Sequence, residues 1–505
     1  MQRIRKYFLR IGETVVIGSL LGVGFVVPAL WWLVFPGLVW WLCLITQAKS
    51  YSQASVNGLY TFFILNVWSY SWFLSVPPVD WLPVADELVW VFVVVYWLTS
   101  ALWSALPGLL LAPILYYSYQ KFFIWFLVPI VSIGWVMADI LGSLLFSIFF
   151  YGPGGTINTN MSVGYIGYQL AQHPSLFHFS AWGGVYALTL VLVGLASVIW
   201  CGYVVRGKRK AFIILVGAVI AILCLTALPT VSVFFQPSIK AGGYTVLVLE
   251  TDFVGQLHDE YVQPEQRLHY YSDILQTLDL DDFDFIVLPE DARLMESFGQ
   301  NLLGLAKFRS VFGTSTNAML IDSGLSSVDG KMVLRGSITQ VSDLQQIHAD
   351  KQYLVPQGEF LPSLYATALR FLGFGAVIDE MEASLAFRPG PMNNQVDAEN
   401  SVPRILFCFE SVNPRGVRQL IDTSISDRPL IVHPLSHAWF NEPTILQQQL
   451  DIMLRIQARW NDVFIISAGN KAPSALYSPD GALLVSDAVT PLQHNTFIRA
   501  YKFSF

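Results

Sequence analysis

Hydrophobic residues are distributed unevenly along this chain, and their pattern changes near residue 240. Before that point the sequence contains apolar segments at about 12–28, 30–46, 56–76, 87–117, 122–150, 180–204 and 211–235. A helix that crosses a bilayer needs about 20 predominantly apolar residues. The pattern therefore predicts a polytopic α-helical membrane domain over residues 1–239, with about seven helices.

After residue 240, short apolar runs alternate with amphipathic segments. The runs 244–250 and 283–290 predict strands, and the segment 264–278 between them has apolar residues at helical spacing. We expect further strands at 404–410, in "PLIVHP" and in "DVFIIS", a helix at 443–460, and a hairpin that turns at Pro479-Asp480-Gly481. Such alternation is typical of sheets covered by helices. Residues 240–505 are therefore expected to form an α/β domain.

Composition and charge separate the same two regions. The whole chain has a mean hydropathy of +0.51 and only 13% charged residues. Residues 1–239 contain ten Lys/Arg and five Asp/Glu, which leaves 19 basic and 31 acidic residues for the second region. A net negative domain lacks the basic patches that phosphate backbones require, so we expect no nucleic-acid partner. The histidines are scattered and no phosphate-binding glycine loop is present, so neither a metal nor another cofactor is expected.

The positions of basic residues predict the orientation of the membrane domain. Basic residues lie before the first span and in alternate connections, namely at Arg3, Arg5, Lys6, Arg10, Lys49, Lys121, Arg206, Lys208, Arg209 and Lys210. The long connection 151–179 contains no Lys or Arg. Cytoplasmic loops carry the excess of basic residues. The N-terminus is therefore expected in the cytoplasm and, after an odd number of spans, the α/β domain outside it.

This orientation makes one cysteine conspicuous. Cys408 lies in the stretch "RILFCFESVNP", whereas the other three cysteines fall within predicted spans. A single thiol in an oxidising compartment has no disulfide partner in its own domain. Most free cysteines are small buried hydrophobic residues, so a chemical role for Cys408 depends on its neighbours.

Two further polar residues lie at the ends of apolar runs, where α/β folds place their chemistry. Glu290 ends "FIVLPE", and Lys351 opens "KQYLVPQGEF". Each has an ordinary explanation when taken alone: a carboxylate at a helix start, a solvated lysine, or a core cysteine. Together, Glu290, Lys351 and Cys408 provide the base, cation and thiol that covalent acyl transfer requires.

These motifs also carry a family resemblance. "DFDFIVLPE", "KQYLVPQGEFLP" and "ILFCFESVNP" resemble, in this order, the Glu, Lys and Cys motifs of the nitrilase or carbon–nitrogen hydrolase superfamily. The preceding multi-span region, with the loop text "GYIGYQLAQHP", is similar to the apolipoprotein N-acyltransferase family. The resemblance implies a nitrilase-like αββα sandwich for residues 240–505.

The resemblance also implies roles for individual residues. Cys408 would be the nucleophile, Glu290 its general base and Lys351 the cation that stabilises the oxyanion. Glu359 and Glu410 match further motif carboxylates, which would orient Lys351 and the incoming amine. The alternative is that Glu359 and Glu410 are ordinary carboxylates in loops, without a role in the site.

Aromatic residues near the expected site complete the set of candidates. Phe409 stands where the family more often has a tyrosine beside the cysteine. Trp439 and Phe440 are candidates for an apolar wall around the substrate, with a place in the core as the alternative. Ser436 and His437 stand where the family has Asn and Asp before "AWF". These departures concern the choice of substrate more than the thiol chemistry.

The implied reaction has two steps. Cys408 takes an acyl chain from a membrane phospholipid, and the α-amine of a lipoprotein's N-terminal diacylglyceryl-cysteine then attacks the thioester. The expected location is the bacterial cytoplasmic membrane, with the α/β domain on its extracytoplasmic side. The protein is expected to be a monomer. Two other hypotheses remain open: a membrane-tethered nitrilase-type amidase or acyltransferase with another acceptor, and a non-catalytic membrane scaffold.

Overall fold

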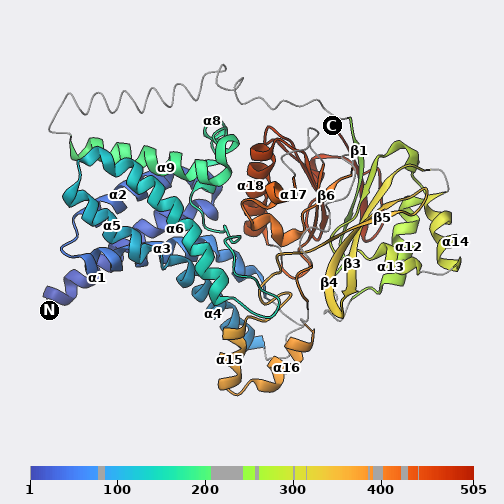
Figure 1. Cartoon of the computed structure of the whole chain (residues 1–505), viewed down its shortest axis with the longest axis horizontal. Helices are drawn as coiled ribbons and strands as arrows, with labels where there is room; N and C mark the ends of the chain where they lie inside the picture. Colours follow the sequence, from blue (N-terminus) through green and yellow to red (C-terminus); the bar gives the residue numbers. More distant parts are fainter. Residues whose placement is uncertain are drawn as a thin grey trace.

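The computed structural model consists of a helical N-terminal part followed by an α/β part (Figure 1). It describes residues 2–77, 86–205, 243–255, 261–299, 302–313, 316–384, 387–390, 402–421, 430–441 and 443–505. The predicted span 211–235 and the predicted boundary at 239/240 lie outside these residues. The fold class predicted from the sequence, a helical membrane-type domain before an αββα sandwich, is confirmed by the described elements.

The helical part is a bundle of mostly long helices. Its elements are α1 (Gln2–Gly22), η1 (Val23–Phe25), η2 (Pro28–Leu33), α2 (Val34–Thr46), α3 (Tyr51–Ser69), η3 (Ser71–Ser75), α4 (Asp86–Ala105), α5 (Gly108–Lys121), η4 (Ile124–Phe126), α6 (Leu127–Phe149), α7 (Gly167–Leu170), α8 (Pro174–Phe177) and α9 (Ser180–Val204). The predicted span 180–204 coincides with α9. The predicted span 87–117 is two helices, because the chain breaks at Leu106 and Pro107 between α4 and α5.

Within the described ranges, four segments are long and apolar enough to cross a membrane: Pro28–Thr46, Leu88–Lys121, Ile124–Phe149 and Ser180–Val204. The predicted span 12–28 corresponds to a shorter apolar helix, Ile11–Phe25. The predicted span 56–76 corresponds to α3 and η3. Buried polar residues of α3 such as Asn57 and Asn66 interrupt its apolar character. The described helices are thus those of a membrane protein, with fewer clear spans than the sequence predicts.

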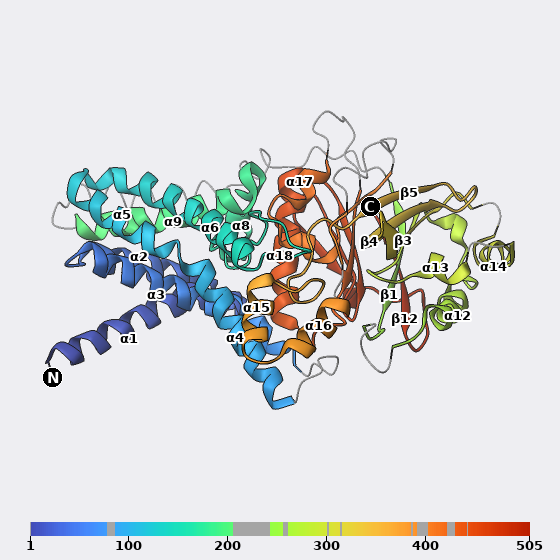
Figure 2. The ribbon, with the colours of Figure 1, turned by 60° about the horizontal axis from the view of Figure 1, so that its bottom comes forward.

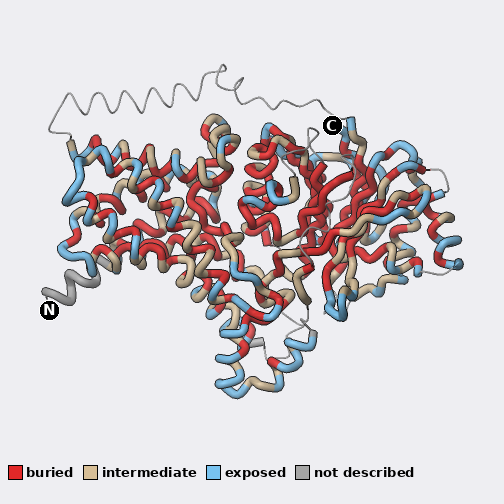
Figure 3. Tube along the Cα trace, viewed as in Figure 1, coloured by how far each residue is buried: buried red, intermediate tan, exposed pale blue. Residues whose placement is uncertain are grey.

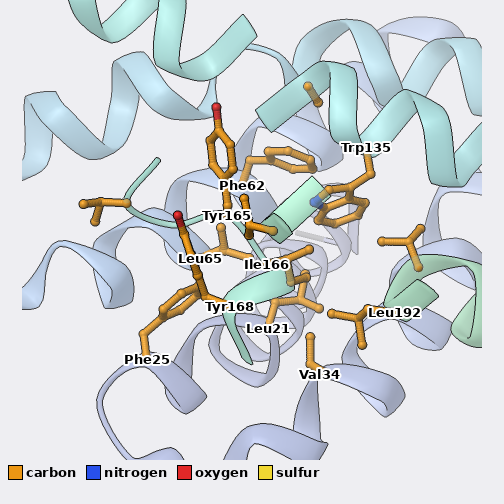
Figure 4. Close-up of a cluster of buried hydrophobic side chains, with 14 of the residues drawn as sticks. Leu21, Phe25, Val34, Phe62, Leu65, Trp135, Tyr165, Ile166, Tyr168 and Leu192 are labelled. Carbon is orange, nitrogen blue, oxygen red and sulfur yellow. The ribbon is translucent and has the colours of Figure 1, made fainter. Parts of the chain in front are cut away.

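The connection between α6 and α9 folds back into the bundle. Its residues Tyr165, Ile166 and Tyr168 are buried among the helices, next to Phe62 and Trp135 (Figure 4). The neighbouring Ser162 N–H donates to the carbonyl of Val412 in the α/β part at 3.2 Å. This connection therefore joins the core of the helical part to the segment that follows Cys408.

The α/β part contains strands and helices in alternation. Its elements are β1 (Thr245–Thr251), α12 (Pro264–Leu275), η5 (Leu280–Asp282), β2 (Phe285–Val287), α13 (Leu294–Phe298), α14 (Leu302–Phe312), β3 (Met319–Val328), β4 (Lys331–Gln340), β5 (Gln346–Asp350), α15 (Ser363–Phe371), α16 (Gly375–Ser384), β6 (Arg404–Ile405), η6 (Cys408–Val412), α17 (Gly416–Leu420), β7 (Ile431–Ser436), α18 (Thr444–Asn461), β8 (Ile465–Asn470), β9 (Ala475–Tyr477), β10 (Leu483–Val485), η7 (Ser486–Ala488), β11 (Gln493–His494) and β12 (Ile498–Ser504). The predicted hairpin at Pro479-Asp480-Gly481 joins β9 to β10.

The described strands form one twelve-stranded sheet that is divided into two layers, called here the first and the second sheet, which are joined by a single strand pair. In the first sheet, β1 pairs with antiparallel β12 and parallel β2, and β3, β4 and β5 continue the order. In the second, β8 lies between parallel β7 and antiparallel β9, with β6 beside β7. The sheets join where Thr251 of β1 pairs with Asn470 of β8. The buried stretches of the trace in Figure 3 follow these strands.

The side chains of β1 point alternately to two different cores, as strand geometry requires. Val246 packs between the sheets with Ile466 of β8. Its neighbour Leu247 packs on the other face with Tyr271 of α12. The outer face of the second sheet packs in the same way on α17 and α18. The order of layers is therefore helix, sheet, sheet, helix.

The two parts of the chain are packed against each other. Helix α18 lies against α9 and faces the helical bundle (Figure 1). Gln449 of α18 donates to the carbonyl of Ser69 at 3.0 Å, and the N–H of Asn441 donates to the carbonyl of Ser75 at 2.9 Å. On another side, α15 and α16 lie beside α4 (Figure 2). Residues from both parts can therefore share one cavity.

Candidate active site

Glu290, Lys351 and Cys408 come from three different elements and line one cavity. Glu290 follows β2, Lys351 follows β5 directly, and Cys408 begins η6. The predicted strand 404–410 is wrong beyond Ile405, where β6 ends. The chain turns into a 3-10 helix there because the Glu410 carboxylate accepts the backbone N–H of Phe407 at 3.0 Å. That turn places the cysteine at the end of a strand.

Lys351 and two carboxylates form a buried charge cluster. Lys351 Nζ donates to Glu290 Oε1 at 2.9 Å and to Glu359 Oε1 at 2.6 Å. The lysine side chain is fully buried, and Glu290 is 9% exposed. Glu359 also accepts the N–H of Val355 at 2.8 Å, which holds its orientation. The structure thus brings together three residues that the sequence proposed for one site.

Burial and charge shift the pKa values of this pair. Burial raises the pKa of the Glu290 carboxyl to about 7, against the opposing effect of the Lys351 ammonium. Burial alone would lower the pKa of Lys351, but the Glu290 and Glu359 carboxylates outweigh it, so that this pKa lies above its ordinary value. Near neutral pH the lysine is therefore charged, and the Glu290 carboxyl can both accept and release a proton.

Cys408 lies beside this cluster with its thiol close to the Ser436 carbonyl, at a sulfur–oxygen distance of 3.8 Å. Burial, together with the Glu290 carboxylate, raises the pKa of the Cys408 thiol, which Lys351 opposes. The resting sulfur is therefore a thiol, and a base must take its proton before it can act as a nucleophile. The Glu290 carboxylate is a base with a suitable pKa in the same cavity.

A buried histidine, His433, connects the backbone of Cys408 to the neighbouring strands. His433 Nε2 lies 3.2 Å from the Cys408 carbonyl, while its Nδ1 pairs with Ser467 Oγ at 2.9 Å. Burial lowers the pKa of His433 to about 4, so the ring is neutral and can donate through one nitrogen and accept through the other. Sequence reasoning gave no role to this histidine.

Glu410 connects the loop of Lys351 to the loop of Cys408. Besides the Phe407 N–H, its carboxylate accepts the N–H groups of Gln352 and Tyr353 at 2.6 and 3.2 Å. The ring of Phe409 packs on Tyr353 with centroids 5.0 Å apart. The oxygens of Glu410 are thus occupied by backbone donors. Its geometry supports a positioning role between the two loops, and the predicted contact with an incoming amine stays a prediction.

The shared cavity has a volume of about 180 Å³, and both parts of the chain contribute to its wall. We call this cavity the chamber. The helical part contributes Trp72, Phe73, Val76, Phe92, Val93, Tyr96, Phe146, Met161 and Val163. The α/β part contributes, besides the charged cluster and Cys408, Trp439, Phe440 and His437 among others. The two aromatic residues proposed from the sequence therefore lie in the chamber wall, where Phe440 also packs edge-on against Trp72.

Sequence reasoning missed the contribution of the helical part to this wall. Trp72, Val93 and Phe146 are separated from Cys408 by most of the chain, and each fits an apolar span equally well as a lipid-facing or core residue. It also missed His433 and His437. The only signal for His437 was its departure from the family pattern before "AWF".

Comparisons with known proteins give a similarity of fold only. No protein-family model matches the sequence, and no curated protein matches it. One similar structure is XC1258 from Xanthomonas campestris, described as a CN-hydrolase superfamily protein with an arsenic adduct in its active site; the identity is 14%, the match covers 52% of this chain and 90% of that one, and the TM-score is 0.33.

A second similar structure is a glutamine-dependent NAD(+) synthetase from Cytophaga hutchinsonii, with 10% identity, 52% of this chain and 43% of that chain covered, and a TM-score of 0.32. The first of these structures is described as a CN-hydrolase superfamily protein, and the similarity to both is weak. At these identities and scores it assigns neither an activity nor a substrate.

Proposed function

We propose that this protein is a phospholipid-dependent N-acyltransferase that modifies the N-terminal diacylglyceryl-cysteine of apolipoproteins through a thioester on Cys408. In this proposal the helical part lies in the bacterial cytoplasmic membrane and the α/β part acts outside the cytoplasm. The donor is a membrane phospholipid, the acceptor is a lipid-anchored protein, and no other cofactor takes part.

The first step forms the acyl-enzyme. The Cys408 sulfur attacks an ester carbonyl of the phospholipid, a C–S bond forms and the ester C–O bond breaks. Glu290 takes the thiol proton and passes it to the departing lysophospholipid oxygen. The buried Lys351 ammonium, held by two carboxylates, is the positive charge available to the oxyanion of the tetrahedral intermediate.

The observation that carries the proposal is the composition of the chamber. The thiol, the base and the cation share it with apolar side chains from helices long enough to cross a membrane, such as Val93 and Phe146. An amidase for a small soluble amide has no need for such a wall. An acyl chain does, and an apolar chamber also keeps water from a thioester.

Intact-protein mass spectrometry tests the proposal. The purified protein is incubated with phospholipid vesicles and compared with the Cys408→Ala variant. We expect an added acyl mass on the wild type alone, discharged by a peptide that carries an N-terminal diacylglyceryl-cysteine. An acyl mass that this peptide does not discharge, but another amine does, would indicate a different acceptor. No acyl mass on the folded wild type would favour an amidase or a scaffold.

A further inference from the structure

His437 is a buried imidazole in the chamber whose hydrogen-bonding capacity is unused. It is 1% exposed and lines the chamber together with Cys408 and Glu290. Neither of its ring nitrogens has a hydrogen-bond partner among the residues that the structure describes. Its described ring neighbour is Phe440, which meets it edge-on with centroids 6.0 Å apart. Buried polar groups in folded proteins are nearly always paired, so two unpaired nitrogens in a substrate chamber indicate a ligand.

The position of His437 relates it to the reacting sulfur. The preceding residue, Ser436, provides the carbonyl that lies 3.8 Å from Cys408 Sγ. The backbone N–H of His437 donates to the carbonyl of Asn470 at 2.9 Å, which fixes the end of β7. The ring is thus attached to a rigid strand end beside the nucleophile, and it does not belong to a mobile surface loop.

The chemistry of the ring selects what it binds. Burial lowers the pKa of His437 to about 4, so the imidazole is neutral and offers one acceptor and one donor nitrogen. A phospholipid ester already meets a cation, because Lys351 is held in the same chamber. An incoming amine needs hydrogen-bond acceptors that direct its lone pair toward the thioester. Glu410 is not among the described residues that line the chamber, and three backbone N–H groups already donate to its carboxylate.

We infer that the imidazole of His437 binds the primary amine of the acyl acceptor during the second half-reaction. This inference rests on the proposed acyl transfer through Cys408. The acceptor nitrogen of the ring takes a hydrogen bond from the neutral α-amine. The amine forms a C–N bond to the thioester carbon and the C–S bond breaks. The proton that the nitrogen loses passes through Glu290 to the departing Cys408 sulfur.

The test separates the two half-reactions. Acyl-enzyme is prepared from wild type, His437→Phe and His437→Asn with phospholipid vesicles, and its discharge is followed by mass spectrometry with a diacylglyceryl-cysteine peptide or with hydroxylamine. His494→Phe, at an exposed histidine of β11, is the matched control. We expect peptide discharge to slow about tenfold in His437→Phe, and acyl-enzyme formation to slow much less. Asparagine, which keeps a donor and an acceptor, is expected to restore most of the rate.

Hydroxylamine distinguishes amine binding from a structural role. As a small strong nucleophile it is expected to discharge His437→Phe and wild type at equal rates. Peptide discharge of His437→Phe at the wild-type rate would overturn the inference. So would an equal loss of acylation, hydroxylamine discharge and peptide discharge, because that pattern indicates a damaged chamber. If the wild-type protein takes up no acyl group, the proposed function itself is overturned. Results with the His437 variants alone bear only on the role of His437 and cannot overturn that function.

Discussion

The ammonium of Lys351 lies 2.9 Å from the carboxylate of Glu290, and both groups are buried. A second carboxylate, Glu359, lies 2.6 Å from the same nitrogen. One buried cation is thus paired with a buried carboxylate and with a second, partly buried one. Because removal of one partner from a buried ion pair leaves an uncompensated charge, we expect the site to need all three residues for stability as well as for the proposed chemistry.

Replacing Lys351 by methionine tests this dependence. We expect Lys351→Met to lose acyl-enzyme formation and to be destabilised by about 3–5 kcal/mol, because two carboxylates then share a dry site. Adding Glu359→Gln removes one of these charges and is expected to restore part of the stability, but not the acylation. Melting temperature in detergent and acyl mass give the two readouts. Lys331→Met, at an exposed lysine of β4, serves as the control; an equal loss of stability there would contradict the assignment.

The pKa of Glu290 predicts the pH dependence of acylation. Burial raises this pKa to about 7, and only the carboxylate form can take the thiol proton. The acylation rate is therefore expected to rise with pH, with a midpoint near 7, and to level off at higher pH. The Glu359 charge contributes to this elevation, so the midpoint of Glu359→Gln is expected at lower pH. Rates of acyl-mass gain across a pH series measure both midpoints, and an upward shift in the variant would refute this account.

The sequence predicted most of the fold and the residues of the site, but not how they meet. The α9 helix followed from a long apolar segment, and the α/β alternation followed from periodicity, because each of its elements buries one apolar face or stripe. The predicted strand 404–410 ends early because of Glu410. The carboxylate of Glu410 accepts hydrogen bonds from the N–H groups of Gln352 and Tyr353, which lie in a loop distant in sequence. The hydrophobic pattern of a sequence does not reveal tertiary hydrogen bonds of this kind. It also does not reveal that Val93 and Cys408 line one chamber.

Glu410 is predicted to affect the rate without contacting the substrate. In Glu410→Ala, three backbone N–H groups lose their acceptor, at a cost of about 1–3 kcal/mol for each of the two buried ones. We expect lower stability and slower alkylation of Cys408 by a thiol reagent, because the loops that carry Lys351 and Cys408 lose their common hydrogen-bond acceptor. Glu380→Ala, an exposed carboxylate of α16, is the matched control. Unchanged alkylation in Glu410→Ala would show that other contacts hold the loops.

The helical wall of the chamber is predicted to select the acyl chain. Val93 of α4 lines the chamber, whereas Val91 of the same helix is 55% exposed. Val93→Trp fills apolar volume and is expected to slow acylation from long-chain phospholipid more than from short-chain phospholipid. Val91→Trp is expected to leave both rates unchanged. Equal effects of the two variants, or no dependence on chain length, would mean that the acyl chain lies elsewhere.

The chamber exists only while the two parts of the chain stay packed against each other. A substitution at Gly184 of α9 tests this packing, because Gly184 lies at the contact between α9 and α18. Its φ of +58° falls in the left-handed region, and an added Cβ would lie 2.5 Å from the ring of Trp460 in α18. Gly184→Ala is therefore strained in its backbone and also displaces α18. We expect a lower melting temperature and slower acylation, with altered tryptophan fluorescence. Gly194→Ala on the same helix meets only Ser132 Oγ at 3.5 Å, an ordinary contact, and is expected to leave the protein unchanged. If Gly184→Ala keeps wild-type acylation despite a lower melting temperature, the chamber tolerates movement between α9 and α18.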